Sequence, residues 1–279
     1  MLSRTLSVKE LDKLHRRSVR EELGVFLAEG KKVIAEAVAA KYTVQQLLIT
    51  DKFFREQRDF LTEKSLMSFP QTMIAEHTAQ RLSATTTPPG IFAVITQPKV
   101  VWEDVARQPW LIAFDNVRDP GNLGTMLRTA DWFGVKAVIV SREGVDPYHD
   151  KVLRGSMGSV FHLQTYLSDD LATDLAELKA QGTKLVTTQP LPAPGLQVET
   201  TALKSPCCLI FGNESVGISG DVQKLAQGVI QIPRYGQAES LNVAVSFGIV
   251  MSQVASVLAQ DALTAAVTTS SRKPPASPK

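Results

Sequence analysis

The stretch WLIAFDNVRDPGNLGTMLRTADWFG, residues 110–134, decides how this chain folds. Its first five residues are apolar and predict a buried strand, and the Pro-Gly pair at 120–121 predicts a sharp turn. Asn122 follows this turn, where its side chain is placed to cap a helix over residues 122–133. Four apolar residues at helical spacing form the buried stripe of that helix: Leu123, Met126, Leu127 and Ala130. This strand–turn–helix unit is typical of an α/β domain.

The same alternation continues towards the C-terminus. The apolar runs predict strands at residues 137–140, 184–187, 207–211 and 229–232, and helices at 151–157, 171–181, 222–227 and 241–258. Strands that alternate with helices indicate a mostly parallel sheet covered on both faces. Ligands of such sheets bind in the loops beyond the carboxyl ends of the strands, so functional residues are expected there.

Shorter elements precede this domain. Strands at 25–28, 44–49 and 91–96 alternate with helices at 8–23, 29–40 and 52–61, which predicts a small α/β module. Residues 97–109 mix Pro, charged residues and Trp, so we place a boundary there. We therefore expect an N-terminal module over residues 1–100, a C-terminal domain over 108–262, and a tail over 265–279 that is rich in Ser, Thr, Pro and Lys and disordered.

Composition excludes several classes of protein. With 279 residues, 44% of them hydrophobic, the chain is neither collagen-like nor wholly disordered. It contains no apolar run of about 18 residues and no apolar signal segment near its start, so we expect a cytoplasmic protein without a membrane span. Cys207 and Cys208 are adjacent in an apolar run, which predicts buried reduced thiols. The four His show no zinc-type spacing, and we expect no metal dependence.

Charge divides the chain. Residues 1–100 carry 15 Lys and Arg against 11 Asp and Glu, whereas residues 101–270 carry 12 against 17. A polyanionic partner would therefore meet the N-terminal module more readily than the C-terminal domain. Arg16, Arg17 and Arg20 of the first predicted helix fit phosphate contacts and a solvated helix face equally well.

Two further loops follow predicted strands. CCLIF, residues 207–211, leads into GNESVGIS, where Gly212 leaves room for a ligand against the backbone and Glu214 faces the crevice. VIQIP, residues 229–233, stops at a proline, and the loop RYGQAES then leads into a helix. Ser240 and Asn242 stand at the start of that helix, where they cap it or contact a ligand.

The three loops together carry a family resemblance. The patterns N-x-R-D-P-G-N-x-G-T-x-x-R-T-A, G-N-E-x-x-G-I and I-P-x-x-G-x-x-x-S-L-N-V-A resemble, in order and spacing, the three motifs of the SpoU (TrmH-like) family of RNA ribose methyltransferases, part of the SPOUT superfamily. This similarity spans about residues 111–258. FLAEGKKVIAEAV and LSATTTPPGIFAVI resemble the substrate-binding module of that family, which is similar to certain ribosomal RNA-binding proteins.

The resemblance implies a fold, a cofactor and a reaction. It implies a parallel sheet with a deep trefoil knot, a homodimer, and transfer of a methyl group from S-adenosylmethionine to a ribose 2′-hydroxyl of structured RNA. By position it implies two sets of residues, for catalysis Asn122, Arg128, Glu214, Ser240 and Asn242, and for cofactor binding Gly212, Ile232 and Leu241. The N-terminal module favours ribosomal RNA over transfer RNA, and a non-catalytic RNA-binding protein of the same fold is the alternative. A plain nucleotide-binding enzyme is disfavoured because no Gly-rich phosphate fingerprint occurs.

Some roles stay open at this point. The family proposal makes the arginine at the position of Arg128 the activator of the hydroxyl, but a guanidinium with a pKa above about 12 is a poor base. Binding the neighbouring phosphate or stabilising the developing alkoxide suits its fork of donors better. Arg234 stands where many relatives carry Met, and fits a phosphate contact or a solvated loop. Arg154, in KVLRGSM, fits contact with RNA or with a partner subunit.

Overall fold

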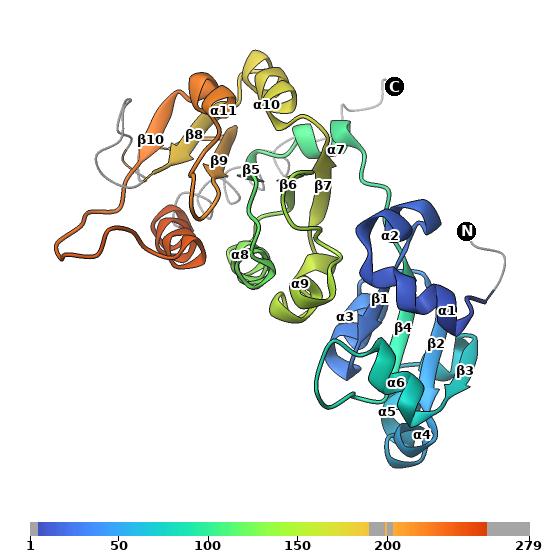
Figure 1. The fold of residues 1–279 in the computed structure, drawn as a ribbon. Helices are drawn as coiled ribbons and strands as arrows, with labels where there is room; N and C mark the ends of the chain where they lie inside the picture. Colours follow the sequence, from blue (N-terminus) through green and yellow to red (C-terminus); the bar gives the residue numbers. More distant parts are fainter. Residues whose placement is uncertain (1–4, 190–198, 200–202, 256–279) are drawn as a thin grey trace, which may run out of the picture.

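The computed structural model describes residues 5–189, 199 and 203–255. These form two sheets with their helices, a four-stranded sheet in the first hundred residues and a six-stranded sheet after them (Figure 1). The predicted tail over 265–279 and the end of the helix predicted at 241–258 lie outside the described residues. No helix in the described part of the chain is long and apolar enough to cross a membrane.

The first sheet is mixed, with the strand order β1-β4-β2-β3. β1 and β2 pair antiparallel to β4, and β2 pairs parallel to β3. The strands are β1 (Val25–Glu29), β2 (Val44–Thr50), β3 (Gln71–Ile74) and β4 (Ile91–Thr96). The helices are α1 (Val8–Leu11), α2 (Arg17–Leu23), α3 (Lys31–Ala39), α4 (Asp51–Glu56), α5 (Arg58–Glu63) and α6 (Glu76–Leu82).

Two helices predicted for this module were wrong in detail, and two further elements were missed. The single helix predicted at 8–23 is broken by a 3₁₀ turn at Asp12–His15 into α1 and α2, and the helix predicted at 52–61 is the pair α4 and α5. β3 and α6 were missed. β3 has four residues, of which only Ile74 is buried, so its sequence shows no apolar alternation.

The second sheet is parallel throughout, with the order β10-β8-β9-β5-β6-β7, which confirms the predicted class. Its strands are β5 (Trp110–Phe114), β6 (Ala137–Ser141), β7 (Gln164–Ser168), β8 (Lys184–Thr188), β9 (Cys207–Phe211) and β10 (Gly228–Ile230). β7 was missed because its sequence, QTYLS, is an edge strand with little apolar content. The short helix α7 (Trp102–Ala106) occupies the segment predicted as a boundary.

Helices cover both faces of the second sheet (Figure 1), and alternate residues along a strand face opposite layers. On β5, Leu111 and Ala113 share a core with α10 (Leu171–Ala180) and α11 (Gly220–Leu225). Ile112 and Phe114 face the other layer, which contains α8 (Pro120–Trp132) and the helix over residues 243–255. Phe247 of that helix packs against Phe114 and Phe211, with ring centroids 5.8 and 4.7 Å apart. The predicted stripe of α8 is buried throughout.

α8 packs against α9 (Asp150–Gly155) at two glycines. A Cβ on Gly124 would lie 2.9 Å from the Cα of Gly155, which is closer than the backbones allow. Gly124 and Gly155 therefore let α8 and α9 approach closely.

Cys207 and Cys208 are buried and unpaired, as predicted. Their side chains lie in the two opposite cores of the sheet. Burial raises the pKa of Cys207 to about 12 and holds that of Cys208 well above its ordinary value, so both are thiols rather than reactive thiolates.

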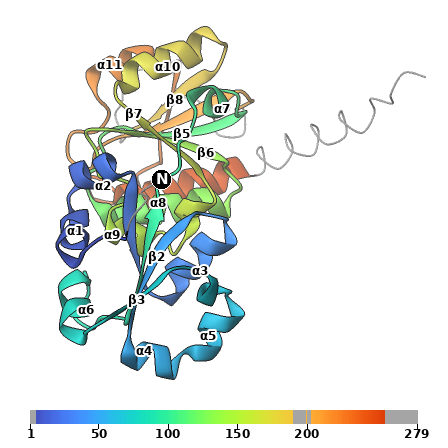
Figure 2. The ribbon, with the colours of Figure 1, turned by 90° about the vertical axis from the view of Figure 1, so that its right-hand side faces the viewer.

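The N-terminal module packs on α9, on the 3₁₀ turn Ser159–Phe161 and on the loop that follows β6 (Figure 2). Phe26 of β1 stacks on Tyr148 and on Phe161, with ring centroids 4.7 and 6.1 Å apart. One buried apolar cluster runs through both parts of the chain. The two sheets therefore share a core, instead of being joined only by residues 97–109.

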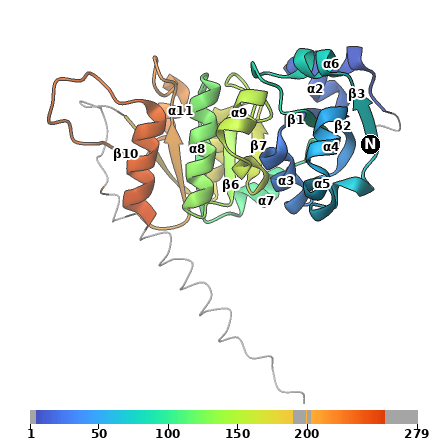
Figure 3. The same cartoon turned by 90° about the horizontal axis from the view of Figure 1, so that it is seen from below.

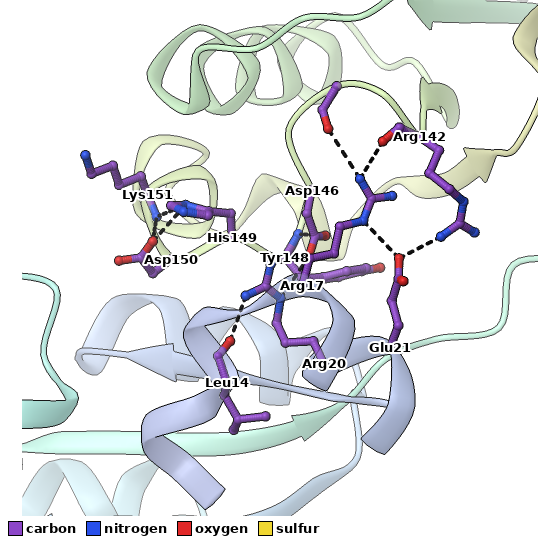
Figure 4. A network of polar contacts seen from close by, with 11 residues as sticks. Leu14, Arg17, Arg20, Glu21, Arg142, Asp146, Tyr148, His149, Asp150 and Lys151 are labelled. Atoms are coloured by element: carbon purple, nitrogen blue, oxygen red, sulfur yellow. Dashed lines mark hydrogen bonds and ion pairs between the residues drawn. The ribbon is translucent and has the colours of Figure 1, made fainter.

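Beside this shared core, arginines of α2 bind the loop that follows β6 (Figure 4). Arg20 is 3% exposed, and its Nε and Nη2 donate to Oδ2 of Asp146 at 2.8 and 2.5 Å while Nη1 donates to the carbonyl of Leu14 at 2.7 Å. Arg17 donates to the carbonyls of Arg142 and Gly144 at 2.6 and 3.3 Å. Glu21 accepts from Nε of Arg17 at 2.9 Å and from Nη1 of Arg142 at 2.7 Å. We call this set the joint, and its members are Arg17, Arg20, Glu21, Arg142, Gly144 and Asp146.

The joint corrects the interpretation of the first helix. Arg20 is neither a phosphate contact nor part of a solvated face, because Asp146 and Leu14 take all of its donor nitrogens in a buried position. Arg17 is also held by the second domain. Of the three arginines, Arg16 alone still fits both a phosphate contact and a solvated face, since it is exposed and has no side-chain partner among the described residues.

Arg154 likewise has partners within its own chain. Its guanidinium lies 3.6 Å from Glu29 of β1 and 3.4 Å from Asp150. Glu29 also accepts hydrogen bonds from Ser83, from Thr85 and from the backbone of Ala84. Arg154 therefore connects α9 to the loop after α6. The trefoil knot stays a prediction, since residues 190–198 and 200–202 between β8 and β9 lie outside the described residues.

Candidate active site

The loops singled out in the sequence leave the same edge of the second sheet. β5 and β9 are parallel neighbours, so the loops at their carboxyl ends, residues 115–119 and 212–219, lie side by side. The backbone N–H of Asp115 donates to the carbonyl of Phe211 at 2.8 Å, which ties the two exits together. The third loop, residues 231–242, runs from β10 to the helix over 243–255.

Glu214 is the acceptor that joins the first two loops. Its carboxylate accepts from the backbone N–H of Arg118 and Asp119 at 3.4 and 3.2 Å, and from Nδ2 of Asn122 at 2.9 Å. Partial burial raises the pKa of Glu214, but these hydrogen bonds outweigh it and lower the pKa below its ordinary value. Glu214 is therefore ionised at neutral pH, where it orients its donors and is too weak a base to take a proton from a hydroxyl.

Asn122 carries this contact on to the third loop. Its Oδ1 accepts from Nδ2 of Asn242 at 3.0 Å, while its own Nδ2 donates to Glu214. The Oδ1 of Asn242 in turn accepts from the backbone N–H of Ala244 and Val245 at 2.8 and 3.3 Å, so Asn242 caps the helix over 243–255. Glu214, Asn122 and Asn242 form one hydrogen-bonded series across three motifs, which we call the polar chain.

The polar chain corrects the predicted role of Asn122 as a helix cap. Asp119 is the N-cap of α8, since its Oδ1 accepts from the backbone N–H of Asn122 at 2.7 Å, and Pro120 is the first helical residue. The side chain of Asn122 is therefore free for Glu214 and Asn242. A capping role could be assigned to either residue from the local sequence, and only the contacts between loops decide it.

Gly212 is required by the chain itself. A Cβ at this position would lie 2.4 Å from the carbonyl carbon of Gly217 and 2.6 Å from the backbone nitrogen of Ile218. The loop returns on itself here, with Asn213 and Gly217 paired through two backbone hydrogen bonds of 2.9 and 3.0 Å. The space expected for a ligand beside Gly212 is thus taken up by residues 217–218, and its proposed part in cofactor binding rests on its backbone alone.

Arg128 and Ser240 lie outside the polar chain. Arg128 is exposed on the outer face of α8, on the same side as Thr125 and Trp132, and its guanidinium has no partner among the described residues. It follows Asn122 by six residues, roughly 9 Å along the helix axis. Ser240 is exposed and its hydroxyl makes no hydrogen bond within the described chain. Arg128 is therefore an unpartnered cation on the helix that carries Asn122, available to a ligand.

The third loop has the features of a site that holds a ligand by its backbone. Ile232 is partly buried against the core, and Leu241 is exposed. Within the described chain, no backbone hydrogen bond involves residues 231–241. The two side-chain amide atoms of Gln231 are buried without a partner. Such a loop offers unpaired N–H and C=O groups next to apolar side chains, which suits a ligand with an adenine ring and an amino acid group.

Several residues that shape the site were missed in the sequence. Asp115 is buried and accepts from the backbone N–H of Ser219 at 2.7 Å. Asn116 has a positive φ of 55°, and its carbonyl accepts from Nδ2 of Asn213 at 2.8 Å. The signal was present in the adjacent letters D-N-x-R-D and G-N-E, because Asp and Asn are the residues that bind turn backbones. Arg234 is exposed and without a polar partner in the described chain, which agrees both with a phosphate contact and with a solvated loop.

Within the described residues, no group of three or more His, Cys, Asp or Glu could hold a metal ion. The candidate site consists of amide, carboxylate and guanidinium groups.

The geometry agrees with comparisons to known families. A family model described as the SpoU rRNA Methylase family matches residues 109–252, and one described as the MRM3-like substrate binding domain matches residues 6–93. The first covers the second sheet with all three loops, and the second covers the first sheet almost entirely.

Individual relatives and structures extend this similarity over most of the chain. The 23S rRNA (guanosine(2553)-2′-O)-methyltransferase RlmP of Bacillus subtilis is 34% identical over 244 residues, which cover 88% of this chain and 94% of that protein. The 23S rRNA (uridine(2479)-2′-O)-methyltransferase of Streptomyces viridochromogenes is 29% identical and covers 83% of this chain and 82% of its own. A crystal structure of an AdoMet-bound rRNA methyltransferase from Sinorhizobium meliloti superposes with a TM-score of 0.77 at 27% identity, covering 90% of this chain and 94% of the other.

Proposed function

The chain belongs to the SpoU rRNA methylase family, and we propose from this that it transfers a methyl group from S-adenosylmethionine to the 2′-hydroxyl of one ribose in ribosomal RNA. The observation that carries the proposal is the polar chain, in which Glu214, Asn122 and Asn242 join the three motifs at the carboxyl edge of a parallel sheet. We propose Asn122, Arg128, Glu214, Ser240 and Asn242 as the catalytic residues.

S-adenosylmethionine supplies a methyl group bound to a sulfonium sulfur. A ribose oxygen attacks the methyl carbon in line with the carbon–sulfur bond, which breaks. We propose that Gly212, Ile232 and Leu241 hold this cofactor through the backbone of the second and third loops. The support is that residues 231–241 leave their backbone groups unpaired, while the cap at Asn242 fixes where the third loop ends.

Arg128 is proposed to act on the acceptor as a cation. Its guanidinium has no protein partner in the described chain, so its donors are free to bind the phosphate beside the acceptor ribose and to stabilise the developing alkoxide. Glu214 and Asn242 contact the side-chain amide of Asn122 from both sides and fix its orientation. Asn122 and Arg128 belong to the same helix, α8, which sets the spacing between them. In this scheme the polar chain positions the ribose and Arg128 provides the charge.

We infer that the substrate is 23S ribosomal RNA in the cytoplasm. The two relatives described above are named for action on this RNA, one at a guanosine and the other at a uridine, and their similarity covers 88% and 83% of this chain. Recognition of structured RNA depends on shape and on unpaired nucleotides, which suits a module held rigidly to the catalytic domain.

We also propose that two copies pair through the face formed by α8 and the helix over 243–255, which lie side by side (Figure 3). Trp132 on α8 is 83% exposed, and Leu241 and Val245 are exposed at the start of the neighbouring helix. Burying such apolar side chains is what a stable interface requires. Sedimentation of Trp132→Asp should then give a monomer, while Met73→Asp, which also places a carboxylate at an exposed apolar side chain but on β3, should keep the dimer.

The proposed reaction is tested by transfer of labelled methyl from S-adenosylmethionine to unmodified total RNA, followed by complete alkaline hydrolysis. A 2′-O-methyl group removes the nucleophile that cleaves the adjacent phosphodiester, so label in an alkali-resistant dinucleotide from the 23S fraction is expected. Label in the transfer RNA fraction would correct the substrate. Label in mononucleotides would assign base methylation, and no transfer to any RNA by a protein that binds the cofactor would favour a non-catalytic RNA-binding protein.

A further inference from the structure

A hollow of about 480 Å³ lies beside the polar chain, between the loops after β5 and β9. Arg118, Asp119, Pro120 and residues 213–216 line it, and none of residues 231–242 does. Its volume is within the range of sites that bind small molecules or nucleotides, about 300–1,000 Å³. The hollow is therefore a feature separate from the third loop, on the outer side of Glu214.

Arg118 is the cation of this hollow, and both its backbone and the Nε of its side chain are held in place. Its backbone N–H donates to Glu214 at 3.4 Å, and its Nε donates to Oδ1 of Asn116 at 3.1 Å. Asn116 is itself fixed, since its backbone N–H donates to Ser141 at 2.7 Å and its carbonyl accepts from Asn213 at 2.8 Å. The two terminal nitrogens of Arg118 have no partner in the described chain, so a preoriented guanidinium fork faces outwards.

Val216 supplies an apolar surface at the other side of the hollow. It is 77% exposed, although its loop is rigidly built. The Oδ1 of Asn213 accepts from the backbone N–H of Ser215 and Val216 at 2.8 and 3.0 Å, and Gly217 pairs with Asn213. An exposed valine on a fixed turn gains nothing for folding, because its apolar surface stays in water.

The two carboxylates near Arg118 do not compete for its free nitrogens. Asp119 accepts from the N–H of Asn122 at the start of α8, and Glu214 accepts from two backbone N–H groups and from the side chain of Asn122. Both carboxylates line the hollow and are exposed, but each is engaged by donors of the protein and neither pairs with Arg118. The hollow combines a free cation, which suits a phosphate, with an apolar shelf, which suits a base or a sugar face.

We propose that this hollow binds a nucleotide next to the acceptor in the RNA strand, with its phosphate on the terminal nitrogens of Arg118 and its base against Val216. The proposal rests on the proposed function and names a substrate contact within it. Glu214 connects the hollow to the polar chain, because it accepts hydrogen bonds both from the side chain of Asn122 and from the backbone of Arg118. A strand whose acceptor ribose lies at Asn122 thus passes directly over Arg118.

The test compares Arg118→Gln with Arg107→Gln, a matched change at an exposed arginine that directly follows α7, before the amino end of β5. The probe is unmodified 23S ribosomal RNA made by transcription, and its Kd is measured at several salt concentrations. Arg118→Gln should weaken binding about tenfold. The slope of log Kd against log salt should fall by about 0.7, as expected for one lost contact to single-stranded phosphate. Its KM for RNA should rise with kcat within twofold, and its Kd for S-adenosylmethionine should equal that of the wild type.

Val216→Ser separates the base contact from the phosphate contact. It should weaken RNA binding about threefold through the lost apolar contact, with an unchanged salt slope. The proposal is overturned if Arg118→Gln matches Arg107→Gln in affinity and slope, while the wild type methylates RNA normally. A weaker affinity of Arg118→Gln for S-adenosylmethionine would assign the hollow to the cofactor and overturn it as well. A wild-type protein that neither binds nor methylates this RNA would overturn the proposed function together with this inference.

Discussion

The joint and the polar chain are both polar networks at the carboxyl edge of the same parallel sheet, yet their side chains are used differently. In the joint, Arg20 is buried and all its donor nitrogens are taken by Asp146 and Leu14. In the polar chain, Asn122 and Glu214 are partly exposed, and the nearby Arg128 has no partner in the described chain. The unpartnered Nη2 of Arg17 in the first network is buried, whereas the unpartnered guanidinium of Arg128, on the helix that carries Asn122, is exposed to a ligand.

The difference shows that a position at the carboxyl edge of a parallel sheet does not by itself make a loop a binding site. Loops at the carboxyl ends of parallel strands are where such sheets bind ligands, and both networks satisfy that rule. The loop after β6, however, is covered by α2 of the N-terminal module (Figure 4). Substitutions in the joint should therefore change stability, and substitutions around the polar chain should change the reaction.

The largest effect is expected for Arg20→Ala. It leaves the carboxylate of Asp146 buried without its ion pair, which costs about 3–5 kcal/mol in the free energy of unfolding. Urea unfolding measures this, with Arg107→Ala as the control at an exposed pair worth at most about 1 kcal/mol. The double variant Arg20→Met with Asp146→Leu should recover most of the loss. A free energy of unfolding for Arg20→Ala within 1 kcal/mol of the wild type would show that the joint is not the structural network described above.

Arg128→Lys should show the opposite pattern. Lysine keeps the charge but loses the planar fork, so we expect methyl transfer to fall about 10²–10³-fold. Cofactor affinity and the free energy of unfolding should stay at wild-type values because Arg128 contacts no protein group in the described chain. Single-turnover transfer and urea unfolding measured on the same preparation decide this, and an active lysine variant would remove Arg128 from the mechanism.

Gly212→Ala tests whether the glycine in the second loop is required for folding. The new Cβ would meet the backbone of residues 217–218, which cannot yield as a flexible side chain would, and a loss of about 1–3 kcal/mol in unfolding free energy is expected. Gly220→Ala on α11, where a Cβ has open space, is the matched control. Equal stability of the two variants would contradict the close approach at Gly212.

The smallest effect is expected for Glu214→Gln. The amide keeps one acceptor oxygen but loses the charge, so we expect about a tenfold loss of transfer. Because the folded pKa of Glu214 lies below its ordinary value of 4.5, its ionised form stabilises the fold above that pH, and this contribution disappears as the pH falls through the lowered pKa. The difference in stability between wild type and Glu214→Gln should therefore be constant near neutral pH and vanish in acid. A difference that grows in acid would contradict the assigned direction.

Much of the second sheet could be predicted from its sequence. Strands at 110–114 and 207–211 agree residue for residue, because both are short apolar runs buried on both faces and bounded by turn residues. β7 and β3 were missed because edge strands need less apolar sequence. The helix predicted at 8–23 was wrong in its continuity, since the 3₁₀ turn at Asp12–His15 has no breaker residue to announce it.

The sequence by itself determined the alternation of strands and helices, the parallel class of the second sheet, and the three loops that carry the candidate site. Each of these depends on residues a few positions apart, and local periodicity and turn chemistry report them directly. Only the tertiary structure decided that Asn122 links loops rather than caps its helix, that Arg20 belongs to a buried joint, and that Arg118 is a held cation. Those roles depend on partners such as Asn242 and Asp146, which lie 120 and 126 positions away. No local pattern encodes such a distant contact, because packing of the whole fold sets which loops meet.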